Sequence, residues 1–268
     1  DEACQSVEPG CWVPLHRADR LILAGDHLQL PPTILSDAAK KEGYAISMME
    51  RLVNHYGDLV TRQLTVQYRM HESIMGFSSQ HFYDNTLIAD DSVRAHVLSD
   101  LPRIQSELIS DDPVTFIDTA GTGWQEEIEP EGLSKRNPDE GRLVLKQVNA
   151  LCEAGVSPSD IAVIAPYAAQ VRWLRENAIY DHLEIDTVDG FQGREKEAVV
   201  ISLVRSNPIG EIGFLSDARR MNVALTRAKR KLIIVGDSAT LGADPFFQSL
   251  LQWIEETGSY RTAWEFAE

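Results

Sequence analysis

The sequence has few cysteines and no long apolar run. Its 268 residues include only three cysteines, Cys4, Cys11 and Cys152, and their spacing fits no metal-ligand pattern. This small, odd number excludes a disulfide framework and indicates a reducing compartment. No stretch approaches the roughly 18 to 20 apolar residues needed to cross a bilayer, and no low-complexity tract occurs. We therefore expect a chain without a membrane segment.

Basic residues are also scarce relative to acidic ones. The chain has 25 Lys and Arg against 41 Asp and Glu, so its formal net charge is −16. Taken alone, this argues against binding of nucleic acid, because phosphate contacts need Lys and Arg. However, residues 100–140 hold eleven acids and three bases, whereas residues 217–231 hold one acid and six bases. The local electrostatic field matters more than the total charge, so the basic segment still allows the chain to bind an anionic partner.

Apolar residues make up 43% of the chain, enough for a substantial core. Many of them form short continuous runs, which suit strands buried on both faces of a parallel sheet. The expected strands are 21–24, 64–66, 114–117, 161–165, 198–204 and 232–235. Helical patterns lie between them. The alternation predicts an α/β fold with right-handed crossovers and a doubly wound parallel sheet.

Two helices can be placed from local signals. Asn137 is expected to cap a helix that has Pro138 in its first turn and Glu140 at its third position. Apolar residues then recur at helical spacing, and Gly155 is expected to end this helix. A second helix is expected from Asp217 onward, with Arg220 and Arg227 on one face because they are seven residues apart. The acidic stretch Gly121 to Pro138 is predicted to be an exposed loop.

Five short motifs follow one another in a fixed order. They are Asp1-Glu2-Ala3-Cys4-Gln5, Gly25-Asp26-His27-Leu28-Gln29-Leu30-Pro31-Pro32, Gln67-Tyr68-Arg69-Met70-His71, Val188-Asp189-Gly190-Phe191-Gln192-Gly193-Arg194-Glu195, and Asn222-Val223-Ala224-Leu225-Thr226-Arg227-Ala228. In that order they resemble motifs II to VI of superfamily 1 helicases. Their wording is similar to the 5′→3′, up-frameshift-like branch, which includes the immunoglobulin mu-binding helicases.

The resemblance covers nearly the whole chain and implies a RecA-like parallel sheet flanked by helices. Residues 1–62 would be the C-terminal part of a first lobe, with motifs II and III. Residues 63–268 would be a complete second lobe, with motifs IV, V and VI. The family's first motif, the phosphate loop G-x-x-x-x-G-K-[ST], is absent from the sequence. We therefore expect the chain to begin within a longer protein and to be inactive alone, with its missing N-terminal half as a partner.

For the first lobe, the resemblance implies a site for ATP and Mg²⁺. Asp1 would hold the metal, and Glu2 would polarise the attacking water. Gln5 would contact the nucleotide, and Gln29 would sense the γ-phosphate. Pro31 would stiffen the loop that leaves this site toward the nucleic acid.

For the second lobe, the resemblance implies residues that close on the same nucleotide. Tyr68 would stack near the base, and Arg69 and Arg227 would reach the γ-phosphate as guanidinium fingers. Gly193 would allow close backbone approach, and Glu195 would bind a ribose hydroxyl. A structural Tyr with an Arg salt bridge is the alternative for Tyr68 and Arg69, and a solvated basic helix is the alternative for Arg227.

Single-stranded nucleic acid would lie across both lobes. Besides Pro31, the residues predicted to contact it are Tyr167, Thr187, Val188, Arg205 and Asn222. An aromatic at a strand end stacks on bases in single-strand channels, but it is equally often a staple for the next helix, so both readings of Tyr167 stay open. The strong acidity of the chain suggests that much of the grip on nucleic acid lies outside it.

We predict the C-terminal motor portion of an ATP-dependent helicase that couples hydrolysis to translocation on single-stranded nucleic acid. One alternative is a non-hydrolysing adaptor that keeps the helicase fold, and another is a lobe of a larger nuclease or repair machine. The expected location is cytoplasmic, or nuclear in a eukaryote. The sequence does not decide between RNA and DNA, and it does not fix the oligomeric state or the pathway.

Overall fold

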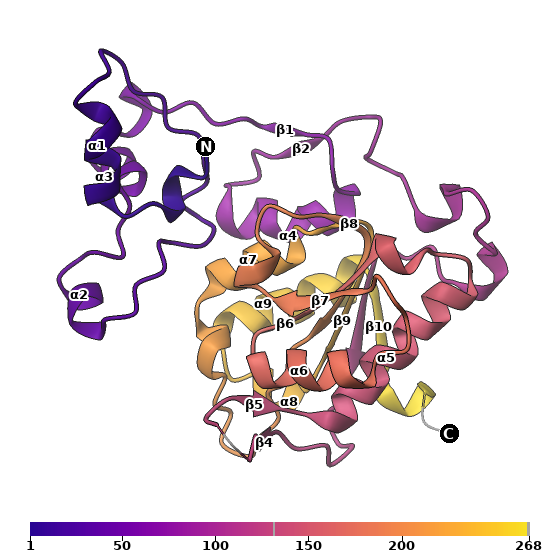
Figure 1. Cartoon of the computed structure of the whole chain (residues 1–268). Helices are drawn as coiled ribbons and strands as arrows, with labels where there is room; N and C mark the ends of the chain where they lie inside the picture. The colour runs from indigo at the N-terminus through magenta and orange to yellow at the C-terminus, as the bar shows by residue number, and fades with distance from the viewer. Residues whose placement is uncertain (131, 267–268) are drawn as a thin grey trace. The chain divides into compact units, whose positions relative to one another are not determined.

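The computed structural model describes residues 1–130 and 132–266 (Figure 1). The chain divides into two compact units, Asp1–Leu64 and Thr65–Glu268. The sequence placed a lobe boundary between residues 62 and 63. Each unit has its own architecture.

The first unit is built from short helices and loops. Its helices are α1 (Glu8–Leu15), α2 (Asp37–Lys41) and α3 (Met48–Tyr56). Ser36 and Ser47 cap α2 and α3, because each hydroxyl accepts a hydrogen bond from a backbone N–H of the first turn. These caps explain where the two helices begin.

The strand predicted at residues 21–24 does not form. Within the described first unit no strand pairs with this segment, and its Ile22 side chain is 91% exposed. A parallel strand is stable only where neighbours satisfy its backbone and cover both of its faces. One backbone bond remains, from Ala3 N–H to Ala24 O at 2.9 Å, and it joins the first motif to the segment before the second.

The second unit contains a six-stranded sheet in which every neighbouring pair is parallel. Its order is β10-β3-β9-β8-β6-β7. The strands are β3 (Val114–Asp118), β6 (Ile161–Ala165), β7 (Glu184–Thr187), β8 (Lys196–Ser202), β9 (Ala228–Gly236) and β10 (Ser259–Thr262). A separate parallel pair joins β1 (Val66–Gln67) to β2 (Ile88–Ala89). This confirms the predicted α/β fold with a parallel sheet.

The central strands form where the sequence has continuous apolar runs. All five side chains of β6 are fully buried, as expected for a strand covered on both faces. The expected strand 198–204 ends earlier, at Ser202. Val204 has φ +70°, and its neighbour closes a tight turn from Arg205 N–H to Leu203 O at 2.8 Å. A β-branched residue in this region is strained, so the surroundings must hold the turn in place.

Helices cover both faces of the sheet (Figure 1). One face packs against α5 (Pro138–Glu153) and α6 (Ala168–Asn177), and the other packs against α4 (Glu72–Phe82) and α9 (Pro245–Thr257). The remaining helices are α7 (Ala218–Leu225) and α8 (Ser238–Leu241). None of the helices in the described residues is long and apolar enough to cross a membrane.

The predicted start of α5 is confirmed. The Asn137 side chain accepts a hydrogen bond from Glu140 N–H at 3.1 Å, and Pro138 occupies the first turn. The helix ends at Glu153, two residues before Gly155. The apolar face of α5 then packs into the core around β6 and β8 through Val144 and Val148. Local capping and apolar spacing together fix this element.

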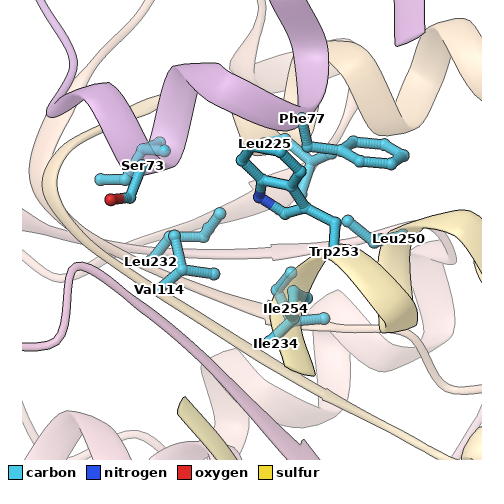
Figure 2. Close-up of a pocket in the computed structure, with 10 residues that line it drawn as sticks. Ser73, Phe77, Val114, Leu225, Leu232, Ile234, Leu250, Trp253 and Ile254 are labelled. Atoms are coloured by element: carbon cyan, nitrogen blue, oxygen red, sulfur yellow. The ribbon is translucent and has the colours of Figure 1, made fainter. Parts of the chain in front are cut away.

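Between α4 and α9 the packing depends on a glycine. A Cβ built on Gly76 would lie 2.5 Å from Cζ2 of Trp253, which is closer than real Cβ contacts come. Trp253 and Phe77 line a small apolar pocket beneath α4, together with Leu250 (Figure 2). The absence of a side chain at Gly76 therefore allows α4 to lie directly on the indole ring.

The acidic stretch from Gly121 to Pro138 is more ordered than the expected loop. It contains the antiparallel hairpin β4 (Glu127–Ile128) and β5 (Lys135–Arg136). The hairpin is anchored by Glu126, whose side chain is 8% exposed. The prediction missed this because a run of acids normally indicates a solvated loop, and the partners of Glu126 are distant in sequence.

Candidate functional site

In the first unit, the acidic motif lies at the surface. Glu2 N–H donates to Asp1 Oδ1 at 2.9 Å, and Gln5 Nε2 donates to Glu2 Oε2 at 2.7 Å. All three side chains are exposed. A cluster of three or more His, Cys, Asp or Glu side chains arranged for a metal is not found among the described residues. Mg²⁺ typically takes one or two carboxylates and completes its shell with water and phosphate oxygens, and Asp1 offers one exposed carboxylate of this kind.

The second motif is organised by Asp26. Its Oδ1 accepts a hydrogen bond from Leu28 N–H at 3.0 Å, and its Oδ2 accepts one from Gln29 Nε2 at 2.9 Å. Gln29 and Pro31 are both half-buried. Because Ala3 bonds to Ala24, the two motifs lie side by side within this unit. Asp26 is a positioning residue to which the sequence pattern assigned no role.

In the second unit, three motifs that are far apart in sequence meet around Arg69. Its Nε donates to Glu195 Oε2 in a short ion pair, and its Nη1 donates to Thr226 O at 3.2 Å. The side chain is one-third exposed, and the neighbouring Tyr68 is 68% exposed. Gly193, two residues before Glu195, is also exposed and has φ +76°. The fourth, fifth and sixth motifs thus form one cluster.

Gln67 fixes the backbone that carries Arg69. Its Oε1 accepts hydrogen bonds from Arg69 N–H at 2.8 Å and Met70 N–H at 2.7 Å, and its Nε2 donates to Met70 O at 2.8 Å. His71 N–H then donates to Lys229 O at 2.8 Å, which ties the motif to the start of β9. The amide of Gln67 therefore holds the loop in the shape that aims Arg69.

Arg227 lies in the same cluster but is buried, with 3% of its surface exposed. Its Nε donates to Val223 O at 2.9 Å, its Nη1 to Arg194 O at 3.3 Å, and its Nη2 to Thr226 Oγ1 at 3.0 Å. In this conformation the guanidinium braces the turn after α7. Because the side chain is buried, contact with a phosphate would require the groups around Arg227 to move.

The expectation that Arg227 shares a helical face with Arg220 is wrong. The helix α7 ends at Leu225, so Arg227 lies in the turn before β9 and does not share a helical face with Arg220. Glu195 directly precedes β8, and Arg227 directly precedes β9. The cluster therefore lies at the amino ends of β8 and β9, whereas open sheets generally bind ligands at the carboxyl ends of their strands.

Charge in this cluster is nearly balanced. Burial alone would raise the pKa of Glu195, but the adjacent Arg69 guanidinium and Lys229 ammonium lower it below its ordinary value. Lys229 Nζ lies 3.3 Å from Glu195 Oε1 and 3.3 Å from Glu197 Oε1. The carboxylate of Glu195 is thus ionised at neutral pH and holds two cations at the amino edge of the sheet.

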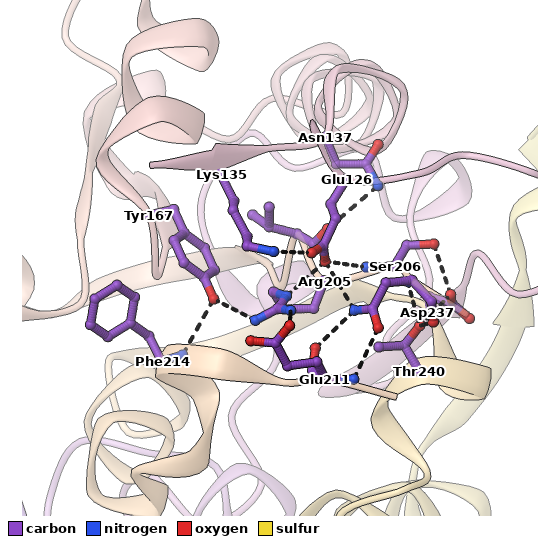
Figure 3. Close-up of polar contacts among 12 residues, drawn as sticks. Glu126, Lys135, Asn137, Tyr167, Arg205, Ser206, Glu211, Phe214, Asp237 and Thr240 are labelled. Atoms are coloured by element: carbon purple, nitrogen blue, oxygen red, sulfur yellow. Dashed lines mark hydrogen bonds and ion pairs between the residues drawn. The ribbon is translucent and has the colours of Figure 1, made fainter. Parts of the chain in front are cut away.

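The carboxyl edge carries a second polar cluster, centred on Arg205 (Figure 3). Its Nε donates to Glu126 Oε2 at 2.7 Å, and its Nη1 donates to Tyr167 Oη at 3.1 Å. Arg205 and Tyr167 are both buried, at 0% and 4% exposure. The guanidinium is therefore held inside the unit, and Tyr167 uses its hydroxyl as an internal acceptor. This arrangement favours a structural part for both residues in this conformation.

Glu126 was not expected to matter, yet it joins four groups. Besides Arg205 it binds Lys135 Nζ at 2.5 Å, Ser206 N–H at 3.0 Å and Asn207 Nδ2 at 3.2 Å. Burial opposes its charge, but these donors lower the pKa of Glu126 below its ordinary value. It therefore fixes the hairpin to the segment that follows β8.

The other residues predicted to contact nucleic acid differ in exposure. Thr187, at the end of β7, is half-buried and accepts a hydrogen bond from Gly190 N–H at 3.2 Å, whereas Val188 is buried. Asn222 is fully buried on α7, where its Nδ2 donates to Tyr83 Oη at 2.8 Å. Asn222 therefore joins α7 to the end of α4. Of Thr187, Val188 and Asn222, Thr187 has the most accessible side chain.

A buried carboxyl lies beside this second cluster. Glu140 is fully buried, and its Oε1 accepts hydrogen bonds from Ser202 Oγ at 2.5 Å and Val204 N–H at 2.8 Å. Among the described residues its Oε2 has no hydrogen-bond partner. Burial raises the pKa of Glu140 to about 7. Glu140 thus holds the strained Val204 turn, and the sequence signals only a first-turn helix acid at this position.

Comparisons with known proteins identify the family of this chain. Sequence profiles described as AAA domain match residues 44–239 and residues 1–37. The chain belongs to the AAA domain family. The relatives described next confirm the resemblance to superfamily 1 helicases that the motifs indicate.

Three of these relatives show the range of similarity. The chain is 48% identical over 270 residues to the DNA-binding protein SMUBP-2 of Mesocricetus auratus, covering 100% of this chain and 27% of that protein. It is 44% identical to the DNA polymerase alpha-associated DNA helicase A of Schizosaccharomyces pombe, covering 96% and 39%. It is 39% identical to the DNA replication ATP-dependent helicase/nuclease DNA2 of Mus musculus, covering 91% and 25%. The chain therefore spans about a quarter to two-fifths of the length of these relatives.

Proposed function

We propose that this chain is the C-terminal motor portion of an ATP-dependent helicase that moves along single-stranded nucleic acid. The observation that best supports the proposal is the meeting of three distant motifs around Arg69, Glu195 and Arg227. Two guanidinium groups that both donate hydrogen bonds to Thr226, next to the exposed Tyr68, suit a polyanion with an attached base.

In the proposed reaction the substrate is ATP. Glu2 holds the attacking water as a hydrogen-bond acceptor, and Asp1 would supply the protein carboxylate to Mg²⁺, which would neutralise phosphate charge. Gln29 hydrogen-bonds to the water or to the terminal phosphate. Arg69 approaches the γ-phosphate, where a guanidinium stabilises the charge that develops during transfer.

Arg227 is proposed to act as a sensor of the closed state. Three of its N–H groups donate to backbone and hydroxyl oxygens and the side chain is buried, so contact with a phosphate is proposed to exchange some of these partners. Such an exchange couples nucleotide binding to the turn between α7 and β9. Movement of this turn is the proposed link from hydrolysis to the nucleic-acid grip.

Hydrolysis is proposed to need a phosphate loop, which this sequence lacks. We therefore test the function on a protein that carries this chain together with such a loop. Turnover should rise when single-stranded nucleic acid is added, and Glu2→Gln should abolish the stimulated rate while ATP still binds. A protein that binds ATP but does not hydrolyse it would instead be a helicase-fold adaptor, which would overturn the proposal.

The substrate strand and the site of action follow from the same proposal. The partner is single-stranded nucleic acid, RNA or DNA, and the proposed location is intracellular. The names of the relatives in Mesocricetus auratus and Schizosaccharomyces pombe refer to DNA, which supports testing DNA first. Comparing stimulation by DNA and RNA of equal length decides between them.

A further inference from the structure

The exposed ring of Phe214 lies at the carboxyl edge of the sheet. Phe214 belongs to the 3₁₀ turn Gly213–Ser216, and its side chain is 60% exposed. Single exposed apolar side chains are common and need no function. Phe214 differs from such residues because buried polar groups contact its turn and fix the position of the ring.

The buried groups that support this turn are Tyr167 and Arg205. Phe214 N–H donates to Tyr167 Oη at 3.3 Å, and the two ring centroids are 5.4 Å apart at an interplanar angle of 59°. The same hydroxyl accepts from Arg205, whose Nε binds Glu126 (Figure 3). Tyr167 thus contacts Phe214 directly, and the buried Arg205 guanidinium holds the hydroxyl of Tyr167.

Gly213 is required for this arrangement. It has φ +55°, and a Cβ built on it would lie 2.0 Å from Arg205 Nη1 and 2.7 Å from Tyr167 Oη. No other residue fits there without moving the network. The turn therefore presses directly on the polar groups below it and presents the ring of Phe214 outward.

A cation accompanies the ring. The Arg220 guanidinium carbon lies 5.8 Å from the Phe214 ring centroid, within the range of a cation–π contact. Arg220 also lies 3.6 Å from Asp189 Oδ1 and 3.6 Å from Asp217 Oδ2. These separations exceed the roughly 2.7 to 2.9 Å of a tight charge-assisted hydrogen bond. A phosphate could therefore replace one of these carboxylates.

We propose that Phe214 is a base-stacking residue for single-stranded nucleic acid and that Arg220 contacts a phosphate of the same nucleotide. The inference rests on the proposed function and adds a specific residue to it. Stacking on an aromatic ring suits any base, because every base has a π face. Asp189 directly follows Val188, so the proposed stacking position adjoins the loop that begins at Thr187.

Other exposed aromatic side chains in the described part of the second unit fit less well. Tyr68 lies at the amino edge beside Arg69. Trp264 is 62% exposed, but it follows β10, the strand at the far edge from β7. Trp264 is therefore a matched control, because it has similar exposure and lies away from the proposed strand path.

The test measures binding of the full-length protein to two oligonucleotides of about 12 residues, a length within the usual site size. One is a fluorescein-labelled thymidylate, and the other carries the same phosphates but no bases. Phe214→Leu should raise the Kd for thymidylate by roughly 5- to 150-fold, the range for loss of one stacked base. Phe214→Trp should bind like wild type, and Trp264→Leu should change nothing.

The abasic strand separates stacking from a structural effect. If Phe214 stacks on a base, wild type and Phe214→Leu should bind the abasic strand with equal affinity. An equal loss on both strands would show that the substitution damages the fold, and it would overturn the inference. Wild-type affinity of Phe214→Leu for thymidylate would also overturn it, while leaving the helicase proposal intact. Failure of the wild-type protein to bind either strand would overturn both.

Arg220 gives an independent readout. Arg220→Gln should weaken binding to both strands and reduce the slope of log Kd against log salt by about one, because one phosphate contact is lost. An unchanged slope would refute the phosphate contact.

Discussion

Replacing Glu140 with Gln is expected to stabilise the second unit, and the gain should grow with pH. The pKa of Glu140 is raised by burial from 4.5 to about 7. The folded state therefore retains a proton that the unfolded state releases between these pH values. The contribution of Glu140 to stability is therefore fully present below pH 4.5. It is lost as the pH rises toward 7 and stays lost above that pH.

The magnitude follows from the size of the shift. One pKa unit corresponds to about 1.36 kcal/mol, so the raised pKa of Glu140 lowers the free energy of unfolding by about 3 kcal/mol at pH 8 and by about 1 kcal/mol at pH 5. Gln has the same shape and is uncharged, and its carbonyl can still accept from Ser202 and Val204. We expect Glu140→Gln to be more stable than wild type by about 3 kcal/mol at pH 8. For a unit of this size that is a rise in Tm of roughly 6 to 12 °C.

The assay is urea unfolding followed by tryptophan fluorescence at pH 5, 6, 7 and 8. Trp173 is a suitable probe because its ring lies against Gly141, next to Glu140. Glu127→Gln, on the exposed hairpin, is the control and should show no gain that grows with pH. If the difference between Glu140→Gln and wild type stays constant from pH 5 to 8, or if the variant is less stable at pH 8, the reasoning about Glu140 is refuted.

Three further outcomes are expected. Gly76→Ala should destabilise the second unit by about 1–3 kcal/mol, because the new Cβ would overlap Trp253. The control is Gly10→Ala, which should not destabilise its helix, because the nearest atom to the new Cβ is 3.8 Å away. Equal losses of stability for the two variants in urea unfolding would contradict the steric argument for Gly76. Glu126→Gln should cost about 3–5 kcal/mol because it removes the nearer of the two carboxylates paired with the buried Arg205 guanidinium, so that only Glu211, at 3.6 Å, remains. A loss under 1 kcal/mol in the same assay would show that the pair with Glu126 is unimportant. The 268-residue chain alone should hydrolyse ATP negligibly even with single-stranded DNA, so robust phosphate release by the purified chain would refute the need for a phosphate loop.

The sheet of the second unit was largely predictable. Continuous apolar runs mark β3 and β6 because strands buried on both faces leave no place for polar residues. The start of α5 was also predictable, since a cap depends only on residues within one turn, here Asn137 and Glu140. These signals are local, and the structure follows them.

Features that depend on distant neighbours were not predictable. Residues 21–24 have the pattern of a strand but lack strand neighbours in the described first unit. Arg227 continues the spacing of a helix that ends two residues earlier, at Leu225. The burial of Glu126 and Glu140 has no signal in the sequence, because acidic residues usually face water. Only the fold brings their donors to them.

The motif residues show the same division. The sequence grouped Arg69, Glu195 and Arg227 through resemblance, and within the second unit they lie together. It did not indicate that Arg227 would be buried or that Gln67 would shape the loop before Arg69. Hydrogen bonds of this kind depend on exact backbone geometry, which spacing alone does not give.

The most direct test of the account is single-stranded-DNA-stimulated ATP hydrolysis by a protein that carries this chain and a phosphate loop. Arg69→Gln and Arg227→Gln should each lower kcat by about 10³-fold or more, as loss of an arginine finger does, with a much smaller change in KM for ATP. Arg142→Gln, an exposed arginine on α5, should keep wild-type turnover. Circular dichroism should show that every variant is folded at the assay temperature, because loss of the hydrogen bonds that Arg227 donates is expected to lower Tm. Near wild-type turnover in a folded Arg69→Gln or Arg227→Gln protein would contradict the claim that these guanidinium groups act on the nucleotide.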